Sequence, residues 1–246
     1  MDLQPAISIV IPVCNEEENV APLSREIAEV LNGRIPYELI FVDDGSTDAT
    51  VAAVRGVRIG ACVRLLQHSR RSGQSAALKT GVHAARAEWV VTLDGDCQND
   101  PADIPRLLQA RDEALRTDPN VRLIMGHRIK RRDTWLRRVS SRVANGIRSR
   151  LLGDRTPDTG CGIKLMHRAT FLELPSFDHM HRFLPALYQR QGTRVISIPV
   201  SHRPRTRGRS KYGLHNRLWV GIVDLFGVMW LRARHWPGLR VTEETL

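Results

Sequence analysis

Residues 89–101 read WVVTLDGDCQNDP, and this stretch gives the strongest indication of the fold. Its first part, Trp89–Leu93, is apolar and β-branched, as a buried strand would be. A polar cluster, Asp94–Pro101, follows directly. Two earlier stretches have the same order: Ile7–Val13 (ISIVIPV) runs into CNEEEN, and Tyr37–Val42 (YELIFV) runs into DDGSTD. In α/β sheets, ligands bind beyond the carboxyl ends of the strands, where these polar residues would lie.

Helical patterns alternate with these strands. We expect helices over Asn19–Leu31, after Thr47, and over Gly73–Ala85, Ile104–Leu115 and Thr134–Leu152, and further strands at Val63–Gln67, Val121–Met125 and Arg194–Val200. Such alternation predicts an α/β fold with a mostly parallel central sheet and helices on both faces. The three polar clusters should then converge at one edge of that sheet.

The composition is that of a globular protein, with 246 residues, 42% of them hydrophobic and 26% charged. Four separated cysteines (Cys14, Cys62, Cys97 and Cys161) form no CxxC pair, which argues against a zinc ribbon or a disulfide scaffold and favours a reducing compartment. The sequence has no apolar run of 18 residues and no basic segment before its first apolar run, so it predicts neither a transmembrane helix nor a secretory signal. We expect one domain over residues 1–212 and a C-terminal appendage over residues 213–246.

The charge is unevenly distributed along the chain. The net charge is +11, although residues 1–50 contain ten acidic and only two basic residues. The basic excess is concentrated in Arg122–Arg155 and Arg203–Arg217. This pattern fits either a solvated surface or a polyanionic partner such as nucleic acid, an anionic membrane or phosphorylated substrates. Nucleic acid is disfavoured because no recognition helix, zinc finger or aromatic platform accompanies the charge.

The polar clusters suggest specific chemistry. Asp94 and Asp96, with Gln98 two residues on, could hold Mg²⁺ or Mn²⁺ together with substrate phosphates; surface turns also produce this spacing. Residues 43–46 (DDGS) are either a turn with a helix cap or a strand-end contact to a base or ribose. Residues 12–16 (PVCNE) could equally be a simple helix start.

In this order, the motifs resemble the inverting family 2 glycosyltransferases of the GT-A fold. Within that family they most resemble dolichyl-phosphate mannose synthases and bacterial polyprenyl-phosphate glycosyltransferases. The resemblance runs from Ile7 to about Tyr212. It rests on Pro12, Asn15, Glu16 and Asn19 (PxxNExxN), Asp43–Thr50 (DDGSxDxT), Asp94, Asp96, Gln98 and Pro101 (DxDxQxxP), Gly126–Arg128 (in place of G-T-R), Ser141–Asn145 (similar to S-R-G-A-N), and Arg205, Gly208, Ser210 and Lys211 (R-x-x-G-x-S-K).

The resemblance implies metal-dependent sugar transfer, with inversion, from a nucleotide-diphospho-sugar to a dolichyl- or undecaprenyl-type phosphate. It implies a donor site formed by Pro12, Cys14, Glu16, Phe41, Asp43, Asp94, Gly95 and Lys211, where Cys14 replaces the usual Tyr. The implied ligands of Mg²⁺ or Mn²⁺ are Asp94, Asp96 and Gln98. The implied catalytic residues are Asp96, Arg128, Arg142 and Arg205, with Arg142 on the acceptor phosphate and Arg128, Arg205 and Lys211 on phosphates generally.

The residue types suit a phosphate acceptor. A phosphomonoester is already ionised near neutral pH, so it needs arginines to position it and no general base. Transfer to a hydroxyl of a glycan would need a base, for which Asp158 is the nearest candidate. A third reading, a basic binding module on an inactive scaffold, conflicts with the intact Asp94, Asp96 and Gln98. His181 and Arg182 could contact substrate or pack in the core.

Two basic or amphipathic segments remain. Arg203–Lys211 could be a solvated loop, a nucleic-acid arm or a lid over phosphates. Leu218–Leu231 is too short to span a bilayer and could pack on the domain or lie in a membrane interface, with Trp219 and Trp230 inserted between flanking arginines. The lipid acceptor implied by the resemblance favours the membrane. We therefore expect a cytoplasmic protein, peripheral on the cytoplasmic face of the membrane, that docks directly or through a small membrane partner protein.

Overall fold

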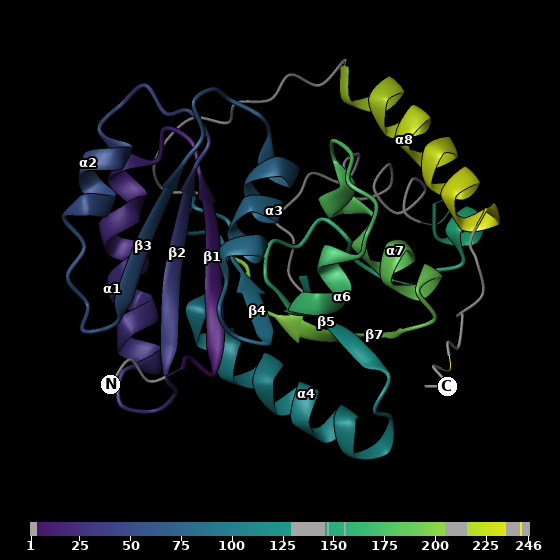
Figure 1. Cartoon of the computed structure of the whole chain (residues 1–246), viewed down its shortest axis with the longest axis horizontal. Helices are drawn as coiled ribbons and strands as arrows, with labels where there is room; N and C mark the ends of the chain where they lie inside the picture. The colour runs from purple at the N-terminus through teal and green to yellow at the C-terminus, as the bar shows by residue number, and fades with distance from the viewer. Residues whose placement is uncertain are drawn as a thin grey trace, which may run out of the picture.

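The computed structural model describes residues 4–128, 146, 148–154, 156–204, 216–234 and 242, and for residues 216–220 it describes the backbone alone. A seven-stranded sheet in the order β3-β2-β1-β4-β6-β5-β7 forms the centre (Figure 1). Its strands are β1 (Ile7–Val13), β2 (Tyr37–Asp43), β3 (Cys62–Gln67), β4 (Trp89–Thr92), β5 (Val121–Arg128), β6 (Lys164–His167) and β7 (Arg194–Val200). All neighbouring pairs are parallel except those of β6, which is antiparallel to β4 and β5.

Helices cover both faces of this sheet. They are α1 (Glu17–Leu31), α2 (Thr50–Arg55), α3 (Gln74–Ala84), α4 (Ile104–Thr117), α6 (Arg168–Leu172), α7 (Leu184–Arg190) and α8 (Asn216–Ala233), with short 3₁₀ turns η1 (Pro101–Asp103) and η2 (Met180–Arg182). The predicted mostly parallel α/β sheet is confirmed. The strand β6 and the helices α6 and α7 were not predicted, because each is short and lies in sequence without a clear period. Residues 148–152 are helical; the rest of the helix expected over Thr134–Leu152 lies outside the described residues, apart from residue 146.

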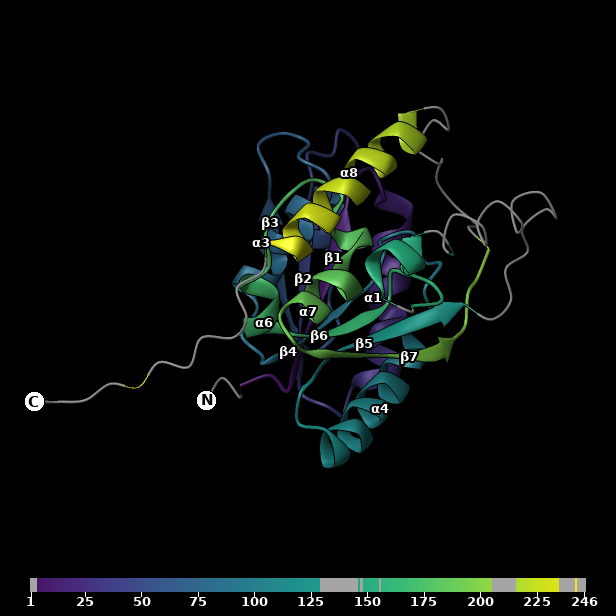
Figure 2. The ribbon, with the colours of Figure 1, turned by 90° about the vertical axis from the view of Figure 1, so that its right-hand side faces the viewer.

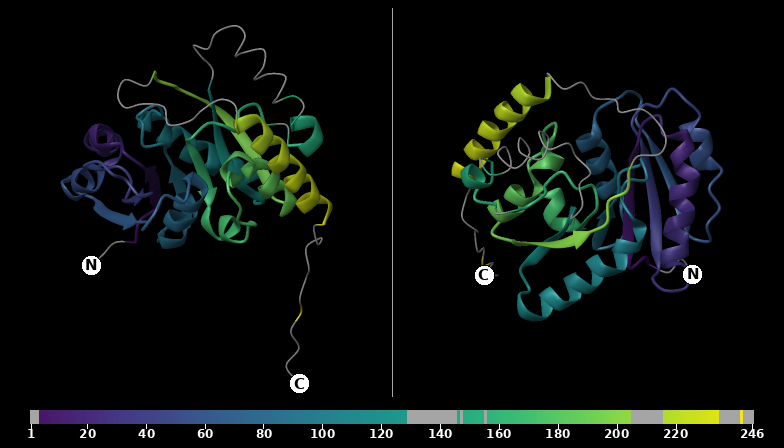
Figure 3. Two further views of the ribbon diagram at one scale, coloured as in Figure 1. Left: turned by 90° about the horizontal axis from the view of Figure 1, so that it is seen from above. Right: turned by 180° about the vertical axis from the view of Figure 1, so that it is seen from behind.

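Alternation along the strands divides the core in two. In β1, Ile9 faces a core shared with α1 and α4, whereas its neighbour Val10 faces a second core shared with α3, α6, α7 and α8. Both side chains are fully buried. Figure 1 shows α1 and α2 on one side of the sheet and α3, α6 and α7 on the other, and Figure 3 shows the arrangement from above and from behind. The period of two residues therefore determines which helix each strand residue contacts.

The C-terminal helix α8 lies over α7, as Figure 2 also shows. Val228 on its inner face is fully buried in the second core, and the Asp224 carboxylate lies 3.2 Å from Nδ1 of His179. Within the described part of the chain, no helix has the length and apolar character needed to cross a bilayer. The helix expected over Leu218–Leu231 is thus present, and one of its faces packs on the domain.

Candidate active site

The polar clusters that follow β1, β2 and β4 meet at one edge of the sheet. In the parallel register Val13 is opposite Asp43, and Val10 is opposite Thr92, directly before the Asp94 cluster. The first two clusters are also bonded to each other, because Asn15 Oδ1 accepts a hydrogen bond of 2.7 Å from the Thr47 N–H. The expected convergence is confirmed by this geometry.

Asp43 lies at the end of β2 with 2% of its surface exposed. Its Oδ2 accepts a 3.3 Å hydrogen bond from the Ser46 N–H. Its Oδ1 is buried and has no hydrogen-bond partner within the described part of the chain. A buried carboxylate oxygen without a partner is costly, so this atom is suited to accept a hydrogen bond from a ligand N–H.

The neighbouring acid, Asp44, has a structural task. Its carboxylate accepts hydrogen bonds from the N–H groups of Ser72 (2.7 Å) and Gly73 (2.8 Å) and lies 2.9 Å from Nδ1 of His68. Burial would raise the pKa of Asp44, but the bonds from Ser72, His68 and Gly73 outweigh it and lower the pKa. Asp44 thereby ties the loop after β3, and the start of α3, to the end of β2.

Three other residues of the implied donor site, Pro12, Cys14 and Glu16, are partly exposed at the same edge. Gly95 is buried, and a Cβ there would lie 2.9 Å from Val13 Cγ1 and 3.0 Å from the Pro12 carbonyl oxygen. Its lack of a side chain lets the turn after β4 rest on β1. Phe41 was expected to line the donor site, but its side chain is fully buried in the first core.

Asp94 follows β4 and keeps only partial exposure to solvent. Burial raises the pKa of its carboxyl, against the opposing effects of the Lys164 and Arg128 charges and of a hydrogen bond from Gln74. Its backbone N–H donates to Asn99 Oδ1 at 3.0 Å. A Cβ on Gly162 would lie 2.1 Å from Asp94 Oδ2, so this carboxylate packs directly on a glycine.

Asp96 and Gln98 lie beside Asp94 and are also partly exposed. Asp96 Oδ1 accepts a 3.2 Å hydrogen bond from the Gln98 N–H. The Gln98 side-chain amide donates to the Arg203 carbonyl oxygen at 3.4 Å, which connects this turn to the segment after β7.

The donor set at this edge fits a hard divalent cation shared with a substrate. Among the described residues, no group of three His, Cys, Asp or Glu side chains is placed to hold a metal ion by itself. Mg²⁺ is commonly held by one or two carboxylates together with substrate phosphates and water, which Asp94 and Asp96 could supply.

Arg128 ends β5 and faces Asp158. Its Nε donates to Asp158 Oδ2 at 2.7 Å and its Nη2 to Oδ1 at 2.9 Å. Burial opposes the charge of Arg128, but the hydrogen bonds and charge of Asp158 raise its pKa above the ordinary value. Asp158, the candidate base for a hydroxyl acceptor, is thus paired with a permanent cation.

Several residues near Asp94 were not singled out from the sequence. They are Gln74, Asn99, Gly162, Lys164 and His202. Lys164 begins β6 with 5% of its surface exposed, and its Nζ donates to the Cys161 carbonyl oxygen. Burial lowers the pKa of Lys164, while the nearby Cys161 and Asp94 oppose that shift. Asn99 and His202 lie side by side in an isolated antiparallel bridge. The one signal in the sequence was a lysine directly before the apolar residues Leu165 and Met166.

His181 is partly exposed, and its ring bonds to α3. Its Nδ1 lies 2.7 Å from Ser75 Oγ, and burial, with the nearby charges of Lys164 and Arg182, lowers its pKa to about 3. Of the two options left open by the sequence, the bond to Ser75 favours packing over contact with substrate. The remaining residues of the implied site, Arg142, Arg205 and Lys211, lie outside the described residues.

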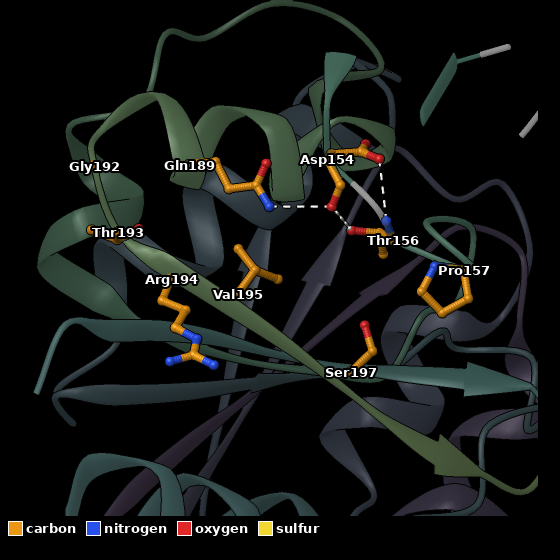
Figure 4. A pocket seen from close by; sticks show the side chains of 9 residues that line it. All are labelled: Asp154, Thr156, Pro157, Gln189, Gly192, Thr193, Arg194, Val195 and Ser197. Carbon is orange, nitrogen blue, oxygen red and sulfur yellow. Dashed lines mark hydrogen bonds between the residues drawn. The ribbon is translucent and has the colours of Figure 1, made fainter. Parts of the chain in front are cut away.

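A separate polar cavity of about 520 Å³ opens beside β7 and α7 (Figure 4). Its lining residues are Asp154, Thr156, Pro157, Gln189, Gly192, Thr193, Arg194, Val195 and Ser197. Asp154 and Arg148 form an ion pair of 3.4 Å there, and Gln189 donates to the Asp154 carbonyl oxygen at 3.1 Å. None of the carboxylates at the strand ends lines this cavity, so it is distinct from the edge that holds Asp94.

The fold and its acid-lined edge define an α/β protein suited to bind a nucleotide with its phosphates. Residues 8–174 match the model of glycosyl transferase family 2, and the chain belongs to this family. The resemblance stated from the motifs is therefore confirmed.

Curated relatives include the dodecaprenyl-phosphate galacturonate synthase of Rhizobium johnstonii, 36% identical over 239 residues, covering 94% of this chain and 69% of the relative. Another is the undecaprenyl-phosphate 4-deoxy-4-formamido-L-arabinose transferase of Edwardsiella ictaluri, 35% identical over 211 residues, covering 85% of this chain and 63% of the relative. The chain thus spans about two thirds of the length of these relatives.

Among solved structures, glucosyl-3-phosphoglycerate synthase from Mycobacterium tuberculosis, in complex with Mn²⁺, UDP-glucose and glycerol 3-phosphate, superposes with a TM-score of 0.69 at 20% identity. The match covers 93% of this chain and 80% of that structure. It confirms the GT-A fold.

Proposed function

We propose that this chain transfers a sugar, with inversion, from a nucleotide-diphospho-sugar to a polyprenyl phosphate, with Mg²⁺ or Mn²⁺. The family supports the transfer of a sugar, and the two relatives named above act on dodecaprenyl and undecaprenyl phosphate. The observation that carries the acceptor class is the pairing of Asp158 with Arg128. A hydroxyl acceptor needs a general base, whereas a phosphate acceptor is already ionised and needs none.

The donor would bind across the ends of β1, β2 and β4. Oδ1 of Asp43, which has no partner among the described residues, would accept a hydrogen bond from an N–H of the base, with Pro12, Cys14 and Glu16 beside it. Asp94, Asp96 and Gln98 would meet the metal and the diphosphate, with Gly95 keeping their turn against β1. The metal would supply a Lewis acid for the departing nucleoside diphosphate.

The acceptor phosphate would approach from the side of Arg128. Two hydrogen bonds to Asp158 fix the guanidinium group in one orientation, which favours contact with an anion by its remaining N–H groups. We include Arg142, Arg205 and Lys211 among the phosphate-binding residues on the basis of their sequence motifs alone. Cations at this position would offset the repulsion between the acceptor phosphate and the donor diphosphate.

The protein would reach its lipid substrate through α8. The outer face of this helix exposes Val223 by 68%, Phe226 by 62% and Trp230 by 62%. Apolar side chains at this spacing form one stripe, and Arg232 and Arg234 follow it. Such a helix suits the interface of an anionic membrane. In our proposal this is the cytoplasmic face of the membrane, and a small membrane protein is a second way to hold the chain there.

The test is an incubation of the purified chain and Mn²⁺ with a panel of nucleotide sugars and a short polyprenyl phosphate, followed by mass spectrometry of the lipid. We expect a glycosylated polyprenyl phosphate with the anomeric configuration of the donor inverted. Product from a matched polyprenol or glycan hydroxyl, and none from the phosphate, would overturn the acceptor class. No product and no nucleotide binding with Mn²⁺ would overturn the enzymatic proposal as a whole.

A further inference from the structure

The side-chain amide of Gln74 connects α3 with the carboxylate of Asp94. Gln74 is the first residue of α3, and its Nε2 donates a 2.8 Å hydrogen bond to Asp94 Oδ1. The other carboxylate oxygen of Asp94 lies against Gly162. Contacts at both oxygens leave the carboxylate little freedom to rotate.

Gln74 itself is held in place from both sides. On one side, Asp44 accepts hydrogen bonds from the Ser72 and Gly73 N–H groups, directly before Gln74. On the other side, Ser75 Oγ lies 2.7 Å from Nδ1 of His181. A side chain with fixed neighbours loses little further freedom when it forms its own hydrogen bond, so it orients its partner effectively.

Asp44 is in turn anchored by more than backbone groups. His68 Nδ1 lies 2.9 Å from Asp44 Oδ1, and His68 Nε2 lies 2.9 Å from Thr80 Oγ1, nearly two turns into α3. The end of β2 and the first turns of α3 are thereby joined at several points. The second acid of the DDGS motif thus fixes the position of Gln74.

We propose that Gln74 is a positioning residue, whose amide orients the Asp94 carboxylate so that the metal and the donor diphosphate bind together. This inference rests on the proposed function, because the proposed function supplies the metal and the donor diphosphate that the Asp94 carboxylate would bind. Residues that hydrogen-bond to a metal-binding side chain commonly contribute about ten- to a hundredfold to metal affinity or activity. Gln74 is placed for that role from outside the DxDxQ motif.

The experiment compares Gln74→Ala and Gln74→Met, which keeps a side chain of similar length without an N–H donor, with a matched control, Gln109→Ala. Gln109 also donates to a carboxylate, Glu113 Oε1 at 2.8 Å, but on the exposed face of α4. The probe is uridine diphosphate or guanosine diphosphate, whichever the wild-type chain binds in the presence of Mn²⁺. Calorimetry would measure the Mn²⁺ concentration at which binding of this probe is half-maximal. Thermal unfolding would report the fold, and kcat and KM for the donor would be measured separately.

Both Gln74 variants should need at least about tenfold more Mn²⁺ than the wild type for half-maximal binding of the probe. Gln109→Ala should need the same Mn²⁺ concentration as the wild type. In an Asp94→Asn background, Gln74→Ala should cause no additional loss, because its partner carboxylate is gone. If Gln74→Ala fails to fold, Gln74→Met preserves most of the side-chain volume and gives the same readout. Half-saturation within twofold of wild type in a folded Gln74 variant would overturn the inference. A wild-type chain that binds neither probe with Mn²⁺ would overturn the proposed function, and this inference with it.

Discussion

Arg128 and Asp158 are joined by two parallel hydrogen bonds of 2.7 and 2.9 Å, and the side chains are only 14% and 9% exposed. The pair links the end of β5 to the segment that leads into β6. It also brings a cation close enough to Asp94 to act on the pKa of that carboxyl. A paired, largely buried carboxylate is poorly suited to receive a proton, so the pair bears on the acceptor class.

Replacing Asp158 distinguishes a positioning role from a general base. Asp158→Asn should lower kcat by about ten- to a hundredfold, the effect of losing a hydrogen bond to a charged group. The pH–rate profile should keep its acidic limb, because no catalytic base has been removed. The check is kcat between pH 5.5 and 8.5 for both proteins. Disappearance of the acidic limb in Asp158→Asn would assign the proton transfer to Asp158 after all.

Removing the second acid of the DxDxQ motif should abolish transfer. Asp96 is partly exposed and accepts a hydrogen bond from the Gln98 N–H, so Asp96→Ala should change the free energy of unfolding by about 1 kcal/mol. Transfer should fall by about a thousandfold, since the metal stabilises several kcal/mol of developing charge. Treating the wild type with EDTA should have the same effect, and Mn²⁺ or Mg²⁺ should restore it. A purified Asp96→Ala enzyme with full activity would refute the metal site.

The close packing of Gly162 on Asp94 predicts a sensitive position outside every recognised motif. A Cβ at residue 162 would lie 2.1 Å from Asp94 Oδ2, and that contact forces the carboxylate to move. Gly162→Ala should lower transfer by about tenfold or more and destabilise the fold by about 1–3 kcal/mol. Gly146→Ala is the control, because a Cβ there meets no atom of the described residues within 4 Å. Equal kinetics for the two variants would show that Asp94 tolerates displacement.

The sequence was most informative where a strand is long and its period is unbroken. β1 and β2, of seven residues each, could be predicted because apolar residues run to the polar cluster that ends them. β6 could not, because its four residues, KLMH, include a lysine that the fold buries. A short antiparallel strand between two parallel ones gains its stability from its neighbours, which no local pattern reveals.

The candidate site was predictable only in part, for a related reason. Asp43, Asp94 and Asp96 follow strands directly, so the strand-end rule finds them. Gln74 and Gly162 reach Asp94 from segments distant in the chain, and only the tertiary fold brings them there. The sequence motif does not distinguish Asp43 from Asp44. Within the described part of the chain, Oδ1 of Asp43 has no hydrogen-bond partner, whereas the Asp44 carboxylate is bonded to the loop after β3.

The imidazole of His181 predicts a loss of stability in mild acid. Its folded-state pKa is about 3, below the ordinary value of 6.5, so the unfolded chain binds a proton more readily as the pH falls. Stability should therefore be intact above pH 6.5 and decline from there towards pH 3, by about 2 kcal/mol at pH 5 from this group. Urea unfolding of wild type and His181→Asn at pH 7.5 and pH 5 measures the difference. An equal decline in both proteins would show that His181 is not responsible.

The exposed stripe on α8 predicts that two side chains on one helix control membrane binding without touching the chemistry. The inner face of the helix is fixed by the buried Val228 and by Asp224 at 3.2 Å from His179. Phe226 and Trp230 point away from that face, each 62% exposed, so Phe226→Ala with Trp230→Ala should leave the fold intact. Each side chain should contribute roughly 1 kcal/mol in the interface, so the double variant should bind anionic vesicles about 30-fold more weakly.

Flotation with phosphatidylglycerol vesicles and with neutral vesicles measures this binding. Transfer to a water-soluble, short-chain polyprenyl phosphate should remain at the wild-type rate, because no residue of the acid-lined edge has changed. Transfer to a long-chain acceptor in vesicles should fall with binding, since the enzyme then reaches its substrate less often. Unchanged vesicle binding by the double variant would mean that α8 does not contact lipid. Loss of activity on the soluble acceptor would mean that the outer face of α8 supports the site itself.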